Sequence, residues 1–301
     1  MRAAVFLGLV GLACSGGSRP DGGVDAGPMP HCEDIFGDRK TQVCLRWSCD
    51  RRSLSEGAWA ADAGACEAGE LPSEAYDNSL RLVNLYRWLA ELPEVTTTSM
   101  RDGAAQQCAL MMHAAGRVDQ MPATTFPCWS QAGAEAARNS IIALTPPVAA
   151  VDGHMRTLAS RRWLMNTTLG PIGIGGTSGA SCHWVSGGMT GASKRFVAWP
   201  PDGVVPLDAL TQSRVDEAGW TVETFSSSAD LSGATIAVRD NGADAPVDVT
   251  VLPQNEGSAY AVSFKPRGWT TQAGHEYVVN VVAPAIQANP MVYTVQVVGC
   301  P

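Results

Sequence analysis

The residue types that could do chemistry are scattered along this chain of 301 residues, with few grouped at motif spacing. The five histidines (31, 113, 154, 183 and 275) stand apart, and no HExxH, GxGxxG or Cys-x-x-Cys pattern occurs. Ser178 follows Gly176 at the spacing of a nucleophile elbow, but the glycine that should close that motif is missing. The net charge of −8 gives no surplus of cations for phosphates, so we expect no nucleic-acid partner. Because the cofactor and metal motifs are missing, we also expect no cofactor.

The nine cysteines indicate an exported protein. Arg2 precedes an apolar run over residues 3–13, which is too short to span a bilayer and has the length of the apolar region of a signal peptide, so residues 1–13 are predicted to be a signal peptide. Cys14 follows directly. Of the next sixteen residues, twelve are Gly, Pro, Ser or Asp, so residues 14–31 are predicted to form a flexible tether.

A short signal, a cysteine and a tether together resemble a bacterial lipoprotein. That resemblance implies lipidation of Cys14 and attachment of the chain to a membrane of the cell envelope. Plain secretion is the alternative, because Gly11 and Ala13 also fit ordinary signal cleavage, which would leave Cys14 free. Eight cysteines then remain to form disulfides, namely Cys32, Cys44, Cys49, Cys66, Cys108, Cys128, Cys182 and Cys300.

The elements expected along the folded part fall into three regions. Residues 32–75 hold four cysteines and few apolar residues, which predicts a small disulfide-stabilised segment. Apolar spacing predicts helices near 72–93, 101–115, 134–143 and 148–158, and short apolar runs predict strands near 171–175, 182–185 and 195–199. This order indicates an α+β domain.

Short alternating runs after about residue 219 predict a second, all-β part. The clearest runs are 247–251, 260–264, 277–282 and 293–298. Six or so strands in about 85 residues favour a small β-sandwich. Because Pro200–Pro201 interrupts the chain between the two patterns, we place the boundary near 205 and expect domains at 76–205 and 206–301.

Several motifs in the α+β part resemble, in their order, a bacterial branch of the CAP superfamily of cysteine-rich secretory, antigen 5 and pathogenesis-related proteins. The motifs are LVNLYR at 82–87, CALMM at 108–112, CW at 128–129, GAEAA at 133–137, RRWLMN at 161–166, LGPIGIG at 169–175, SCHWV at 181–185 and AWPP at 198–201. The resemblance covers residues 76–205 and implies an α-β-α sandwich with a cleft across its sheet.

The same resemblance implies a degenerate cleft. Family members with an intact cleft hold a divalent cation with two histidines and two acidic residues. Here Gln120 and Ser160 stand at the histidine positions, whereas Glu135 matches one acidic residue. Gln and Ser are poor ligands for zinc-like ions and do not act as bases near pH 7, so we expect no bound metal. Asp119 and His154 lie nearby in sequence and are the candidates for a rearranged site.

The resemblance also implies a Cys108–Cys128 bridge, which would leave Cys182 to pair with Cys300. Met111, Met112, Trp163, Trp184 and Trp199 are interpreted as packing residues. We therefore expect a non-enzymatic envelope protein that binds an extracellular or envelope ligand through a degenerate cleft. The alternatives are a metal-dependent hydrolase with a rearranged site and a carrier of lipid or sterol in an apolar groove.

Overall fold

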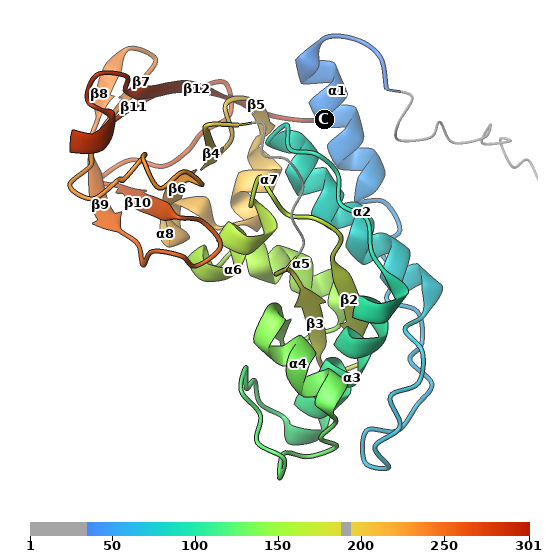
Figure 1. The fold of residues 1–301 in the computed structure, drawn as a ribbon. Helices are drawn as coiled ribbons and strands as arrows, with labels where there is room; N and C mark the ends of the chain where they lie inside the picture. Colours follow the sequence, from blue (N-terminus) through green and yellow to red (C-terminus); the bar gives the residue numbers. More distant parts are fainter. Residues whose placement is uncertain (1–34, 188–193) are drawn as a thin grey trace, which may run out of the picture.

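The computed structural model describes residues 35–187 and 194–301 and has a helical part beside a sheet-rich part (Figure 1). The helices of the described residues are α1 (Arg39–Asp50), α2 (Ser73–Leu89), α3 (Ser99–Ala115), α4 (Gln131–Asn139), α5 (Pro147–Met155), α6 (Leu158–Leu164), α7 (Leu207–Gln212) and α8 (Val215–Ala218). A 3-10 turn, η1, spans Pro284–Ile286. The expected α+β class, with strands dominating the C-terminal part, is confirmed.

The strands form three sheets. They are β1 (Ser140–Ala143), β2 (Gly173–Gly176), β3 (Ser181–Trp184), β4 (Phe196–Trp199), β5 (Gly203–Pro206), β6 (Trp220–Thr224), β7 (Thr235–Asp240), β8 (Ala243–Ala245), β9 (Val247–Val251), β10 (Tyr260–Pro266), β11 (Glu276–Val282) and β12 (Met291–Val298). The small sheet has the order β1-β3-β2, and the larger two have the orders β4-β6-β10-β9 and β5-β12-β11-β7-β8.

The long helices begin and end where local chemistry requires. The Thr98 hydroxyl accepts a hydrogen bond from the Arg101 amide at the start of α3, and Gly116 ends that helix in the left-handed region. Two expectations need correction. The helix expected over 134–143 ends at Asn139, because the β-branched pair Ile141–Ile142 instead joins strand β1. Helix α1 was not predicted at all.

The small sheet lies between two helical layers. Alternate residues of its strands belong to two separate apolar clusters: Ile141 and Ile174 pack with α2 and α5, whereas Cys182 and Trp184 pack with α3 and α4. Period-two alternation in a strand produces this division. Met111 and Met112 are fully buried in the α3–α4 layer, as expected for packing residues.

The glycines of the 173–176 run allow α3 to lie against the sheet. A Cβ on Gly175 would stand 2.1 Å from the Ala105 carbonyl carbon, and one on Gly173 would stand 2.6 Å from backbone atoms of Arg101. Only residues without a Cβ permit this approach. The glycine-rich run is therefore a packing surface, and it holds β2 against the helix.

The two larger sheets include strands from before the expected domain boundary. β4 pairs with β6, and β5 pairs in parallel with β12. The strand expected at 195–199 thus exists, but it belongs to the C-terminal sheets and not to the small sheet. Pro200–Pro201 lies where the chain crosses from one large sheet to the other, and the expected boundary at 205–206 falls inside β5.

The disulfides differ from both expected pairs. Cys108 is bonded to Cys182, Cys66 to Cys128 and Cys44 to Cys300. Cys108 faces the sheet on the buried side of α3, so its partner comes from β3 and not from the following loop. The expected disulfides within residues 32–75 are also wrong for Cys44 and Cys66, because both are bonded to cysteines outside that segment. Cys49 is disulfide-bonded, and Cys14 and Cys32 lie outside the described residues.

Candidate functional site

A cleft of about 360 Å³ lies where the helical part meets the sheet-rich part. Its lining residues are Val118, Gln120, Arg138, Asn139, Ser140, Ile141, Ile142, Ala159, Ser160, Trp163, Val185, Ser186 and Glu256. The volume lies within the range of small-ligand sites in proteins. Strand β1 and the loop before α4 supply one side, and α6 supplies the other.

The loop between β9 and β10 completes the cleft from the sheet-rich part. Asn166 donates through Nδ2 to the Gly257 carbonyl at 2.9 Å, and Arg162 donates through Nε to the Ser258 hydroxyl at 3.1 Å. A Cβ on Gly257 would stand 2.7 Å from the Arg162 carbonyl carbon, so the loop lies directly on α6. These contacts fix Glu256 at the cleft.

The structure brings together two of the three residues expected in the degenerate cleft. Gln120 and Ser160 both line it, although forty residues separate them in sequence. The Gln120 amide donates through Nε2 to the Ser140 carbonyl at 3.2 Å, and the Ser160 hydroxyl forms no hydrogen bond within 35–187 and 194–301. Glu135 is exposed on α4 and does not line the cleft. Glu135 was expected in the degenerate cleft, and the structure instead places it outside the lining that Gln120 and Ser160 share.

The rearranged metal site is not assembled either. Asp119 accepts from Arg117 and from the Met121 amide, so its carboxylate is used within its own loop. His154, expected on a helix surface, is only 4% exposed and faces His183 instead. Among the described residues, no group of three or more His, Cys, Asp or Glu side chains is placed to hold a metal ion.

The cleft is polar and mostly uncharged. The Ser140 hydroxyl is buried at its floor without a hydrogen-bond partner, and the half-buried Trp163 keeps an indole N–H that meets no acceptor in the described chain. Ser186 donates to the Asn139 side-chain oxygen. Arg138 and Glu256 are the charged lining residues. Such a surface offers hydrogen bonds and an aromatic face, and Glu256 supplies the carboxylate of the lining.

A buried charge cluster lies behind α6, between the two parts of the molecule. Arg161, Arg162 and Glu223 are each at most 1% exposed. Arg161 donates through Nη2 to the Gly219 carbonyl at 2.6 Å. Arg162 Nη1 lies 3.9 Å from Glu256 Oε2, which makes a long ion pair. Burial raises the pKa of Glu223 to about 7, an effect that the nearby arginines oppose, and it lowers the pKa of Arg161 to about 10. This cluster positions α6 and thereby one wall of the cleft.

A buried serine–histidine pair lies on the α2–α5 side of the small sheet. The Ser79 hydroxyl is 2.8 Å from His183 Nε2, which is the contact of an activated nucleophile. Both residues are fully buried, and the His183 ring packs edge to face on His154 with centroids 5.2 Å apart. Burial lowers the pKa of His183 to about 4. Since substrate has no access there, the pair is part of the core.

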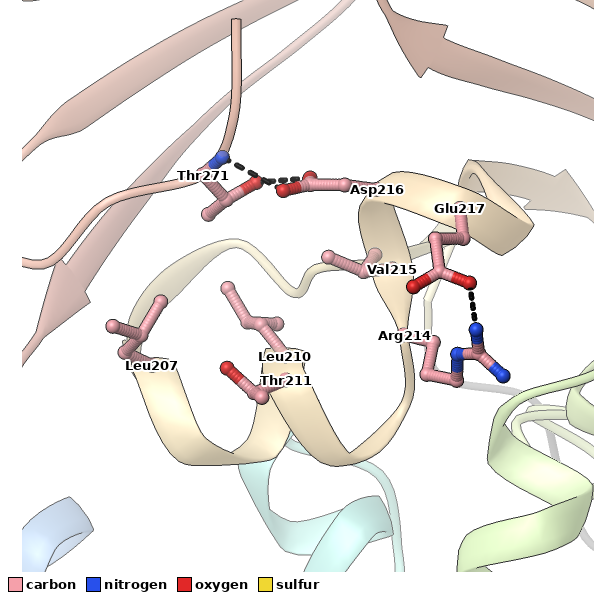
Figure 2. A pocket seen from close by; sticks show the side chains of 8 residues that line it. All are labelled: Leu207, Leu210, Thr211, Arg214, Val215, Asp216, Glu217 and Thr271. Carbon is pink, nitrogen blue, oxygen red and sulfur yellow. Dashed lines mark hydrogen bonds and ion pairs between the residues drawn. The ribbon is translucent and has the colours of Figure 1, made fainter.

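A smaller cavity of about 170 Å³ lies beside α7 and α8 (Figure 2). The charged side chains around it are already paired: Asp216 accepts from the Thr271 amide at 2.9 Å and from the Thr271 hydroxyl, and Arg214 pairs with Glu217. These contacts join α8 to the loop before β11. The cavity therefore belongs to a structural contact between elements.

Two residues of the cleft, Gln120 and Ser160, were predicted from the sequence, whereas Trp163 and Glu256 were not predicted to line it. Gln120 and Ser160 were expected from the family resemblance, and Trp163 was interpreted as a packing residue, with binding of sugar or peptide by an exposed tryptophan pair as the alternative. Glu256 gave no signal, because it lies in a polar turn that approaches α6 only after the sheets have formed. Trp184 and Trp199 are buried, as expected.

Comparison with known proteins gives no independent assignment, since no protein-family model, curated protein or solved structure matches the chain. Within residues 35–187 and 194–301, no helix combines the length and apolar character needed to cross a bilayer. The proposed anchor at Cys14 and the signal segment lie outside the described residues.

Proposed function

We propose that this chain is an exported, lipid-anchored protein of the cell envelope that binds a ligand in the cleft between α6 and β1 and does not turn it over. The observation that carries the proposal is the neutral, hydrogen-bonding lining at the two positions where the CAP resemblance places histidines. Gln120 and Ser160 share one cleft with the half-buried indole of Trp163. This set offers neutral hydrogen-bonding groups and an aromatic face with which to recognise a ligand.

The ligand that fits this lining is rich in neutral hydrogen-bonding groups. The side-chain amide of Gln120 and the hydroxyl of Ser160 pair well with such groups, because each can donate and accept hydrogen bonds. The apolar side chains of Ile142 and Trp163 add burial of apolar surface.

The binding test uses a variant that fills the cleft. Ser160→Trp places an indole in the opening, whereas Ser232→Trp adds the same side chain at an exposed position on the β6–β7 connection. We expect ligands recovered by the full-length protein from glycan and peptide arrays to lose at least tenfold in affinity with Ser160→Trp and to keep wild-type affinity with Ser232→Trp. Equal binding by all three proteins would place the ligand elsewhere and overturn the proposal.

Calorimetric titration tests the absence of metal chemistry. Zn²⁺ and Ca²⁺ should give no site-specific heat with either the wild type or Glu135→Ala, because Glu135 lies outside the cleft. Micromolar binding abolished by that substitution would instead support a metal-dependent enzyme. Mass spectrometry of the mature chain tests the anchor, and an unmodified Cys14 would show that the protein is released.

A further inference from the structure

Strand β1 presents an unpaired edge along the cleft. It is the outermost strand of the small sheet, whose order is β1-β3-β2, and Ser140, Ile141 and Ile142 all line the cleft. An exposed strand edge carries N–H and C=O groups that can pair with another extended chain. Such pairing requires backbone groups of β1 that point away from β3, toward the cleft.

The pairing register with β3 determines the direction of each backbone group of β1. The Val185 amide donates to the Asn139 carbonyl at 2.9 Å, and the register pairs Ser140 with Trp184 and Ile142 with Cys182. In an antiparallel pair, hydrogen-bonded and non-hydrogen-bonded positions alternate, so Asn139 and Ile141 point their backbone groups toward β3. Ser140 and Ile142 therefore point theirs away from β3, toward the cleft.

Contacts at Ser140 agree with this direction. Its carbonyl accepts the Gln120 amide at 3.2 Å, and its N–H donates to the Ala137 carbonyl at the end of α4. Ile142 has no such partner for either backbone group in the described parts of the chain. A side-chain amide thus already occupies the first pairing position of the edge, and the second position is free.

The surroundings of the edge select a single extended chain. Residues of α6 and of the loop that carries Gln120 line the same cleft as the edge, and an extended peptide can lie along its length of about 13 Å. Arg138 is exposed at the cleft and forms no ion pair within the described residues. Its guanidinium complements an acidic side chain.

We propose that the cleft binds an extended peptide segment, which adds as a strand to β1 through the Ile142 backbone and places an acidic side chain against Arg138. This inference rests on the proposed binding function of the cleft and names its ligand class. Backbone pairing supplies affinity in this binding mode, and the pockets for alternate side chains supply specificity.

Random heptapeptides displayed on phage provide the probe for the full-length protein. We expect enrichment of sequences with alternating β-branched residues and one Asp or Glu. Arg138→Glu should shift the enriched charge from acidic to basic, whereas Arg267→Glu, an exposed substitution outside the cleft lining, should leave the acidic preference unchanged. Enriched peptides that ignore the Arg138 reversal would overturn the charge assignment.

Backbone pairing is tested separately by hydrogen exchange and N-methylation. An enriched peptide should slow exchange of the Ile142 amide at least tenfold, and methylating its alternate backbone nitrogens should weaken binding at least tenfold. If ligands bind and Ser160→Trp blocks them but the Ile142 amide stays unprotected, strand addition is wrong while the binding function stands. If no array ligand or heptapeptide binds the cleft, both proposals fail. An edge-to-edge dimer, detected by sedimentation, would instead identify a second copy as the occupant.

Discussion

At the scale of single residues, the most unusual chemistry lies behind the cleft and not within it. Glu223 is buried beside Arg161 and Arg162, and one of its carboxylate oxygens has no hydrogen-bond partner. An acid in this position is easier to keep neutral than charged, because desolvation opposes its ionised form. The contact between the two parts of the molecule therefore depends on pH through this one side chain.

Glu223→Gln tests that dependence. The pKa of Glu223 is raised to about 7 in the folded chain from an ordinary value of 4.5, so its contribution to stability is present below pH 4.5 and is lost as the pH rises through 7. We expect the variant to gain on the wild type by about 3 kcal/mol between pH 4.5 and pH 8 in urea unfolding. Glu217→Gln, at an exposed carboxylate, is the control and should show no such gain.

His154 makes the folded chain less stable at low pH, whereas Glu223 makes it less stable at high pH. Burial and the neighbouring His183 hold the pKa of His154 well below 6.5, so the folded chain favours its neutral form and loses stability as the pH falls below 6.5. His154→Phe keeps a ring of similar shape and removes the titrating group. Relative to the wild type, its unfolding free energy should improve as the pH falls from 8 to 5, measured by urea unfolding at each pH. Parallel pH profiles for the two proteins would contradict this assignment.

At the scale of elements, the close approach of β2 to α3 decides how the small sheet is held. Gly173 and Gly175 lie against the backbone of α3 over residues 101–106, and the Cys108–Cys182 disulfide joins the same helix to the next strand. The helix and sheet therefore form one rigid layer, and β1 at the far edge of that sheet stays available for the cleft.

Gly175→Ala should break that layer. The added Cβ meets helix backbone that cannot move aside, so we expect a loss of about 3 kcal/mol or more in unfolding free energy, as for severe overpacking of a core. Gly103→Ala on α3 is the matched control, because no atom lies within 4 Å of its added Cβ. That substitution should stabilise the chain by about 0.5–1 kcal/mol through helix propensity. Similar effects from the two substitutions would mean that the close approach is absent.

At the scale of the whole molecule, the two ends of the described chain meet. The C-terminus lies beside α1 (Figure 1), and Cys44 on α1 is bonded to Cys300, 256 residues away. Arg51, which follows the last residue of α1, donates a pair of hydrogen bonds at 2.6 and 2.9 Å to Asp152 on α5. The N-terminal helix is thus attached to both the helical part and the end of the sheet-rich part.

Replacing both cysteines of this bridge by serine should destabilise the protein without unfolding it. The disulfide restricts the unfolded chain, and its removal should cost about 2–4 kcal/mol, measured by guanidinium unfolding. Hydrogen exchange should rise more in α1 than in α3, because α1 loses its own bridge whereas the Cys108–Cys182 bridge of α3 is retained. Unchanged exchange in α1 would show that the ion pair and packing hold the helix alone.

Prediction from the sequence succeeded where the signal is local. Periodic apolar residues located α2 and α3, and alternating residues located β9 to β12. The prediction was wrong about which strands pair with each other. The strand at 196–199 was expected in the small sheet but pairs with β6, since the sequence of an edge strand says little about which strand lies next to it. The disulfide expectations failed for the same reason, because pairing follows proximity in the fold.

The sequence by itself determined the α+β class, the turn-rich second half, the neutral residues at 120 and 160 and the expectation of export. The tertiary structure alone decided that Gln120, Ser160 and Glu256 line one cleft, that Glu135 lies outside it and that the Ile142 backbone faces into it. Secondary structure follows from the pattern of neighbouring residues, which the sequence contains. A site assembled from β1, α6 and a distant loop depends on packing between elements, which is settled only when the whole chain has folded.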